Sequence, residues 1–210
     1  MSDFEEKTRK IGEIVKRRNS EMSEILPFLY LGNRLNASCE QQLEKNGIKR
    51  ILSIHDRPLT TKSHPFVENY KFIKMSDTAD SDILSVFGEA VEFVHCGRIK
   101  KEPVLVHCLM GQSRSATIIG AYLSTFYELD GPTALQFVRQ RRKQTNPNVG
   151  FIMQLNNYAK NLATSERCRI LQSSSSPFQT NYAHQQMQNN DIQMINKYCP
   201  FAVNLSSTPK

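Results

Sequence analysis

Short apolar runs alternate along this chain with longer segments whose apolar residues recur every three or four positions. The runs lie at 48–54, 70–73 and 104–106, and brief runs of this kind are typical of buried β-strands. The helical period occurs over 83–100 and 113–127. Strands that alternate with helices predict an α/β fold, in which a central, mainly parallel sheet is flanked by helices on both faces.

Capping residues predict the ends of further helices. Asn36 is expected to cap a helix that runs to residue 46, where Gly47 ends it. Asp130 precedes a Gly-Pro pair that is typical of a helix start, and Asn148 is expected to cap a last helix to about residue 163.

The composition divides the chain into three parts. Residues 1–21 mix acidic and basic side chains and form a charged arm, and residues 22–163 form the predicted folded domain. Residues 164–210 are rich in Ser, Gln and Asn, which predicts a mostly disordered tail. Three side chains of this tail are apolar enough to dock on a domain: Tyr198, Pro200 and Phe201.

The strongest chemical signal lies where the strand 104–106 ends and the helix 113–127 begins. The residues from His107 to Ser115 read His-Cys-Leu-Met-Gly-Gln-Ser-Arg-Ser. A loop at a helix N-terminus can direct several backbone N–H groups at one anion, and Arg114 adds a planar guanidinium that suits two phosphate oxygens. The same positive potential favours a thiolate at Cys108.

Each of the other polar or small positions has a chemical reason. Gly111 permits a tight turn and lets the backbone approach an anion. Ser113 and Ser115 can cap the helix or donate a hydrogen bond to the thiolate. His107 can orient the loop through a hydrogen bond.

Three other interpretations of this loop are weaker. A buried structural cysteine is common, but Cys, Gly and Arg together at a strand-to-helix turn favour catalysis. Zinc is not expected, because no second Cys or His stands at ligand spacing around Cys108. The loop lacks the Lys of a nucleotide-binding P-loop. We therefore predict neither a metal nor a cofactor.

The motif resembles the HCx5R signature of the cysteine-dependent protein phosphatases. Its Ser-Arg-Ser ending, with the length of the chain, is similar to the small atypical dual-specificity phosphatases. The segment 24–33 resembles the opening strand of that family, 48–54 its next core strand, and 146–151 the start of its last helix. The resemblance covers about residues 22–162.

The resemblance implies a general acid, because the leaving oxygen of a phosphate ester needs a proton. Three aspartates follow the strand-like segment 70–73. Asp82 is interpreted as a helix N-cap and Asp80 as a loop residue. Asp77 stands directly after the strand, where the family places its acid, so we assign the role to Asp77 over a simple turn function.

The implied mechanism proceeds through a phosphocysteine. Cys108 attacks phosphorus, Asp77 protonates the leaving oxygen and then activates water, and Ser115 helps Cys108 to leave as a thiolate. The residues expected to bind the substrate are His107, Leu109, Met110, Gly111, Gln112, Ser113 and Arg114.

The leading hypothesis is a protein phosphatase for phosphotyrosine and for phosphoserine or phosphothreonine. A phosphoinositide or RNA 5′-phosphatase of the same superfamily is the alternative. Lipid-directed relatives typically carry Lys inside the loop, and RNA-directed relatives usually end it in Arg-Thr-Gly, whereas this loop has neither. A phosphoprotein-binding pseudophosphatase ranks last, because such relatives lose the nucleophile and Cys108 is present.

Composition also limits the cellular compartment, the membrane association and the partners that we expect. Five scattered cysteines without a CxxC pair predict a reducing compartment, hence the cytoplasm, the nucleus or both. The longest apolar runs are far shorter than the ~18 residues of a membrane span, and Ser2 excludes N-myristoylation. A formal charge of +7 without Trp or basic–aromatic interleaving favours a solvated basic surface, so nucleic acid is not expected as a partner. The resemblance implies phosphorylated proteins as the partners. The basic run 139–143 is interpreted as a helix C-terminus, with a partner site as the alternative. The oligomeric state is left open.

Overall fold

The computed structural model describes residues 21–57, 65–172 and 181–200, so the arm predicted over 1–21 lies almost wholly outside the described residues. Its core is a five-stranded sheet in the order β1-β2-β5-β3-β4. The strands are β1 (Ser23–Leu26), β2 (Leu29–Gly32), β3 (Arg50–His55), β4 (Asn69–Lys74) and β5 (Val104–His107). Only β1 is antiparallel to its neighbour, which confirms the predicted, mainly parallel sheet.

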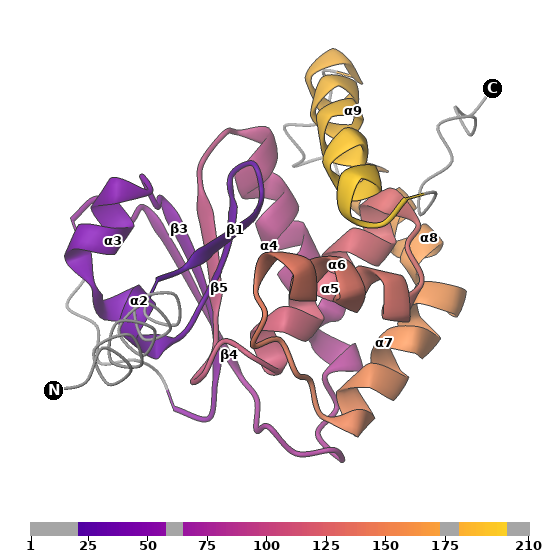
Figure 1. Ribbon diagram of the computed structural model, residues 1–210, viewed down its shortest axis with the longest axis horizontal. Coiled ribbons are helices and arrows are strands. Elements are labelled where there is room, and N and C mark those ends of the chain that lie inside the picture. The colour runs from indigo at the N-terminus through magenta and orange to yellow at the C-terminus, as the bar shows by residue number, and fades with distance from the viewer. Residues whose placement is uncertain (1–20, 58–64, 173–180, 201–210) are drawn as a thin grey trace, which may run out of the picture.

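Helices cover both faces of this sheet, as the alternating pattern predicts (Figure 1). One face carries α2 (Arg34–Ser38) and α3 (Glu40–Lys45). The other helices are the 3-10 turn η1 (Leu84–Val86), α4 (Phe87–Ile99), α5 (Arg114–Tyr127), α6 (Gly131–Arg141), α7 (Val149–Asn161), α8 (Ala163–Gln172) and α9 (Asn181–Tyr198). Among the residues that the structure places, no helix combines the length and apolar character needed to cross a bilayer.

The two faces of the sheet have separate apolar clusters. Along β5, Val104 and Val106 belong to the larger cluster and Leu105 to the smaller one, because successive side chains of a strand point to opposite faces. Every residue of α5 is buried. The helix that follows the catalytic loop is therefore the centre of the larger core, and the loop rests on a rigid base.

Most predicted helix boundaries are confirmed. The segment 83–100 forms η1 and α4, and 113–127 forms α5. Asp130 caps α6 by accepting the backbone N–H of Thr133 at 2.8 Å. Asn148 caps α7 by accepting the N–H of Phe151 at 2.9 Å.

The helix predicted from Asn36 to residue 46 is wrong in its start and its continuity. Asn33 is the cap of α2, and Asn36 is the third helical residue, whose side-chain oxygen accepts the Asn33 N–H at 2.8 Å. This reciprocal arrangement is a capping box. Cys39 is extended and separates α2 from α3, whereas Gly47 has the expected positive φ of +60° after the helix end.

The opening segment 24–33 is two strands and not one. Pro27 and Phe28 form a tight turn, and Leu26 pairs with Leu29 across the antiparallel β1–β2 hairpin. Pro27 lacks the N–H that a continuous strand would need. Phe28 adopts a left-handed φ of +64°, which reverses the chain.

The prediction of a mostly disordered tail is wrong for residues 164–172 and 181–198, which form α8 and α9. Asp191 and Ile195 of α9 and Cys199, directly after its end, are all buried and recur every four residues. This narrow stripe faces the domain although the surrounding composition is polar. Tyr198 docks as the sequence allows, because its ring contacts Phe137 with 6.1 Å between ring centroids.

A buried ion pair attaches α9 to the domain. The Arg98 guanidinium donates to both Asp191 carboxylate oxygens, at 2.9 and 3.0 Å, and to the Tyr122 and Tyr127 hydroxyl groups at 2.9 and 3.0 Å. Burial alone would lower the pKa of Arg98, but these partners together hold it well above its ordinary value. The pair lies beside Pro27, which precedes β2. It is therefore near the start of the parallel strands, whereas the catalytic loop follows the end of β5.

Candidate active site

The catalytic loop leaves the sheet at the carboxyl end of β5, between two parallel neighbours. Gly111 stands at its turn with a φ of +66°, a conformation that favours glycine. A Cβ atom at this position would also lie 2.4 Å from the Gly32 carbonyl oxygen, which is too close. Position 111 therefore requires glycine for its backbone conformation and for its packing.

Cys108 lies at the base of this loop and is 1% exposed. Its sulfur accepts two hydrogen bonds of 3.2 Å, one from the Gly111 N–H and one from the Ser115 hydroxyl. Ser115 is in the first turn of α5, where the helix dipole is positive. All of these contacts stabilise a negative charge on the sulfur.

His107 is fully buried beside the loop. Its Nδ1 lies 3.4 Å from the Cys108 carbonyl oxygen, so a proton on Nδ1 can orient the peptide that follows. Burial lowers the pKa of His107 to about 4. The imidazole is therefore neutral near pH 7 and suits an orienting role better than an electrostatic one.

The Arg114 guanidinium is held by residues that follow two other strands. It donates to the Met75 carbonyl oxygen at 2.9 Å, just beyond β4, and pairs with Asp56 at 3.2 Å, just beyond β3. A hydrogen bond from Ser76, aided by the charge of Arg114, lowers the pKa of Asp56. These contacts fix the plane of a group that is 3% exposed.

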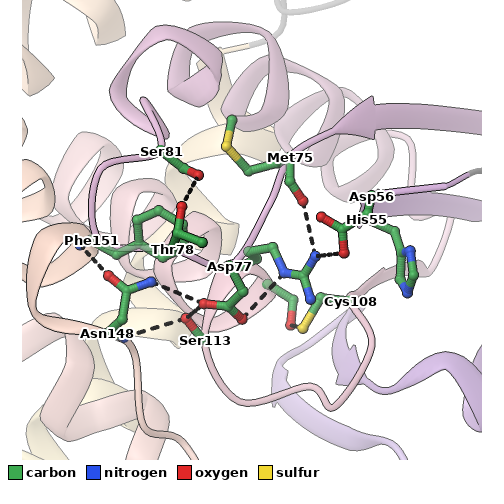
Figure 2. Close-up of polar contacts among 12 residues, drawn as sticks. His55, Asp56, Met75, Asp77, Thr78, Ser81, Cys108, Ser113, Asn148 and Phe151 are labelled. Atoms are coloured by element: carbon green, nitrogen blue, oxygen red, sulfur yellow. Dashed lines mark hydrogen bonds and ion pairs between the residues drawn. The ribbon is translucent and has the colours of Figure 1, made fainter.

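Of the three aspartates that the sequence offers as the acid, Asp77 is the one that contacts the catalytic loop. One carboxylate oxygen accepts from the Ser113 hydroxyl at 2.6 Å and from the Asn148 side-chain amide at 3.0 Å. The other lies 3.3 Å from Arg114 Nε as an ion pair (Figure 2). These three contacts hold the carboxylate beside the catalytic loop and next to the Arg114 guanidinium.

The two other aspartates have local partners. Asp82 accepts the Ser85 N–H at 3.2 Å, which is the capping contact that the sequence predicts. Asp80 is exposed, and a hydrogen bond from Thr78 lowers its pKa. This difference in placement favours Asp77 as the acid, and its catalytic role stays a prediction.

The segment that carries Asp77 is attached to α7. A Cβ atom at Gly150 would lie 1.8 Å from the Ala79 carbonyl oxygen, so only glycine permits this approach. The Gln154 amide donates to the Ser81 carbonyl oxygen and accepts the Leu84 N–H, both at 2.9 Å. The first two turns of α7 thus hold the position of the proposed acid.

The buried Arg142 side chain holds the backbone of the catalytic loop at Gly111. This side chain is 1% exposed, and its Nε donates to the Gly111 carbonyl oxygen at 2.9 Å. Burial lowers its pKa to about 10, and attraction to Cys108 opposes that shift, so the group stays cationic near pH 7. The basic run 139–143 does end a helix, as predicted, but Arg142 within it belongs to the catalytic loop's support.

The structure brings together Cys108, Arg114 and Asp77, to which the sequence assigned the chemistry, and adds residues that orient them. Asn148 caps α7, as the sequence predicts, and its side-chain amide nitrogen also donates a hydrogen bond to the Asp77 carboxylate. Asp56, Met75 and Arg142 gave no local signal, because their contacts join segments far apart in the chain. Within 21–57, 65–172 and 181–200, no group of three His, Cys, Asp or Glu side chains could hold a metal ion.

A buried thiol at the N-terminus of a helix, an oriented arginine six residues later and a carboxylate above them define a cysteine-dependent phosphatase. Comparison with known protein families supports this class. Residues 29–161 match the family described as dual specificity phosphatase, catalytic domain. The chain belongs to this family. The match ends within one residue of the limit of the resemblance found in the sequence.

Individual relatives and structures agree with the family match. The chain is 40% identical to mouse dual specificity protein phosphatase 22 over 143 residues, which cover 67% of this chain and 75% of that protein. It is 38% identical to mouse dual specificity protein phosphatase 15 over 150 residues, which cover 70% of this chain and 61% of that protein. A crystal structure of DUSP15 superposes with a TM-score of 0.68 at 34% identity, over 72% of this chain and 95% of that one.

Proposed function

We propose that this protein is a protein phosphatase that hydrolyses phosphotyrosine and phosphoserine or phosphothreonine through a phosphocysteine intermediate. The observation that carries the proposal is the Cys108 sulfur, which accepts hydrogen bonds from Gly111 and Ser115 beside the oriented Arg114. The names of the relatives, dual specificity protein phosphatases, support the same substrate class.

In the first step the Cys108 thiolate attacks phosphorus in line with the ester oxygen. A sulfur–phosphorus bond forms and the phosphorus–oxygen bond to the substrate breaks. Arg114 and the N–H groups of residues 109–114 hold the other phosphate oxygens as charge develops on them. Asp77 gives its proton to the departing oxygen.

In the second step water attacks the phosphocysteine, and the Asp77 carboxylate takes its proton. The sulfur–phosphorus bond breaks, inorganic phosphate forms, and the electron pair returns to Cys108. The Ser115 hydroxyl, 3.2 Å from the sulfur, stabilises the departing thiolate. No metal is needed in either step.

The side chains inside the loop favour a protein substrate over a highly charged inositol phosphate. Leu109 and Met110 are apolar and exposed at the mouth of the site, where a polyphosphate would require cations. Cys108, Arg114 and Asp77 together disfavour a pseudophosphatase. We place the reaction in the cytoplasm or the nucleus, because the five cysteines are free thiols and suit a reducing compartment.

A substrate panel tests this proposal. The wild-type protein should release phosphate from phosphotyrosine, phosphoserine and phosphothreonine peptides, and should do so faster than from a phosphoinositide or an RNA 5′-phosphate. The catalytically dead Cys108→Ser protein provides the blank. A clear preference for the lipid or the RNA would move the protein to the alternative substrate class.

Asp77→Ala should lose activity in proportion to how much the leaving group needs a proton. We expect a loss of roughly 10²-fold or more in kcat on phenyl or alkyl phosphates. The loss should be much smaller on an activated aryl phosphate, whose leaving group departs unprotonated. The alkaline limb of the pH–rate profile should flatten in the variant, since it reports the acid that has been removed.

Asp80→Ala and Asp82→Ala are the matched controls for this experiment. Both remove a carboxylate from the same segment, and neither should show the dependence on the leaving group. If Asp80→Ala reproduced it and Asp77→Ala did not, the assignment of the acid would be wrong by three residues.

A further inference from the structure

Exposed apolar side chains gather around the mouth of the catalytic loop. The described residues contain eight large apolar side chains that are exposed, and five of them come from the catalytic loop and from the starts of α2 and α7. We call these five the apolar rim: Leu35 (75% exposed), Leu109 (41%), Met110 (59%), Val149 (65%) and Met153 (66%). The remaining three are scattered over β4, the end of α7 and α8: Tyr70, Leu162 and Leu171.

The loop itself contributes the centre of the rim. Leu109 and Met110 follow Cys108 directly, so their side chains stand beside the point where phosphorus must arrive. The start of α2 lies against the same stretch, because the Arg34 N–H donates to the Leu109 carbonyl oxygen at 3.2 Å. Leu35, the next residue, therefore extends the rim on this side.

The start of α7 contributes the opposite side. The side-chain amide of Asn148 bonds Asp77 at 3.0 Å, and its backbone N–H lies 3.4 Å from the Ser113 hydroxyl. Val149 is the next residue. Met153 follows four positions later, so the two side chains are neighbours on one face of the helix. The rim thus lies on both sides of the phosphate site.

The position of the apolar rim indicates that the substrate chain itself lies over it. A phosphorylated side chain that reaches Cys108 brings its own backbone over Leu109 and Met110. An extended chain advances about 3.3 Å per residue, so the residues on each side of the phosphorylated one extend from the loop toward the starts of α2 and α7. Exposed apolar surface is typical of a binding site, and here two of its residues, Leu109 and Met110, belong to the catalytic loop itself.

We propose that the apolar rim is the docking surface for the substrate chain and selects phosphoproteins with bulky apolar residues within about three positions of the phosphorylated residue. This inference rests on the proposed phosphatase activity. It adds a sequence preference that the phosphate-binding loop alone does not supply. The preference arises because apolar flanking residues remove the rim from water, whereas charged or small ones leave it exposed.

Two phosphotyrosine peptides of equal length and net charge test the preference. One carries Leu, Ile or Phe at the two positions on each side of the phosphotyrosine, and the other carries Ser or Gln there. The wild-type protein should show kcat/KM at least about tenfold higher for the apolar peptide, mainly through KM. Equal values for the two peptides would overturn the proposal.

Variants then locate the preference on the rim. Leu35→Gln and Met153→Gln change exposed positions outside the catalytic machinery, and the double variant should remove most of the preference by raising KM for the apolar peptide. Leu171→Gln, an equally conservative change at an exposed apolar position on α8, should leave it intact. A preference that survives in the double variant would also overturn the rim as its source.

A small aryl phosphate separates this proposal from the one on which it depends. It has no flanking residues, so the wild-type protein, the double variant and Leu171→Gln should hydrolyse it at the same rate. If the wild-type protein failed to hydrolyse it, the phosphatase function itself would be refuted. If it is hydrolysed and the peptides are not distinguished, only the docking surface is refuted.

Discussion

Cys108→Ser should give a folded protein with no measurable turnover on any phosphate ester. The serine hydroxyl has nearly the size of the thiol, so the buried position 108 is filled without a clash. A hydroxyl is far harder to ionise than a thiol, however, and the nucleophile is the anion. The hydrogen bonds from Gly111 and Ser115 that stabilise a sulfur anion cannot compensate for that difference.

The control for this variant is Cys168→Ser, which changes an exposed cysteine on α8 and should retain full activity. An alkylating reagent should inactivate the wild-type protein, and phosphate or vanadate should protect it by occupying the loop. Turnover by pure Cys108→Ser at a rate near that of the wild type would exclude Cys108 as the nucleophile.

The catalytic loop could be predicted from the sequence because its determinants are local. Cys108, Gly111 and Arg114 lie within seven consecutive residues, between a strand and a helix whose apolar patterns are clear. The same holds for the caps Asp130 and Asn148, whose hydrogen-bond partners lie three residues further along the chain. Short-range patterns of this kind do not depend on how the strands are ordered.

The supporting contacts could not be predicted, because they depend on that order. Asp56 and Met75 reach Arg114 only because β3 lies between β5 and β4 in the sheet, so that the ends of the three strands meet. Arg142 resembled an ordinary basic residue at a helix end, and its burial against Gly111 comes from tertiary packing. The hairpin at Pro27, by contrast, did have a local signal, because proline lacks the N–H that a continuous strand needs.

The C-terminal helix shows how average composition can mislead. The Gln- and Asn-rich segment has few apolar residues, yet Ile195 and Cys199 are buried with a spacing of four. The decisive residue is Asp191, whose charge argued for solvent exposure. Its partner Arg98 lies 93 residues earlier in the chain, so the pairing has no counterpart in local sequence.

Asp191→Ala should destabilise the protein by about 3–5 kcal/mol, because it leaves the Arg98 guanidinium buried without its counterion. Arg98 and Asp191 are both fully buried, and the Tyr127 hydroxyl also donates to the same carboxylate. The free energy of unfolding, measured by urea titration of the full chain, tests the effect. Gln193→Ala, an exposed position on the same helix, should change stability by less than about 0.5 kcal/mol.

Replacing both members of the pair separates the cost of an orphaned charge from the loss of packing. The double variant Arg98→Leu with Asp191→Leu should be clearly more stable than Asp191→Ala, because no buried charge remains. At temperatures where the variants stay folded, kcat/KM on a small aryl phosphate should match the wild type. The pair lies near the start of the parallel strands, whereas Cys108 follows the end of β5. If Asp191→Ala lowered the free energy of unfolding by less than about 1 kcal/mol, α9 would contribute little to the stability of the folded domain. That result would support the disordered tail that the composition predicts.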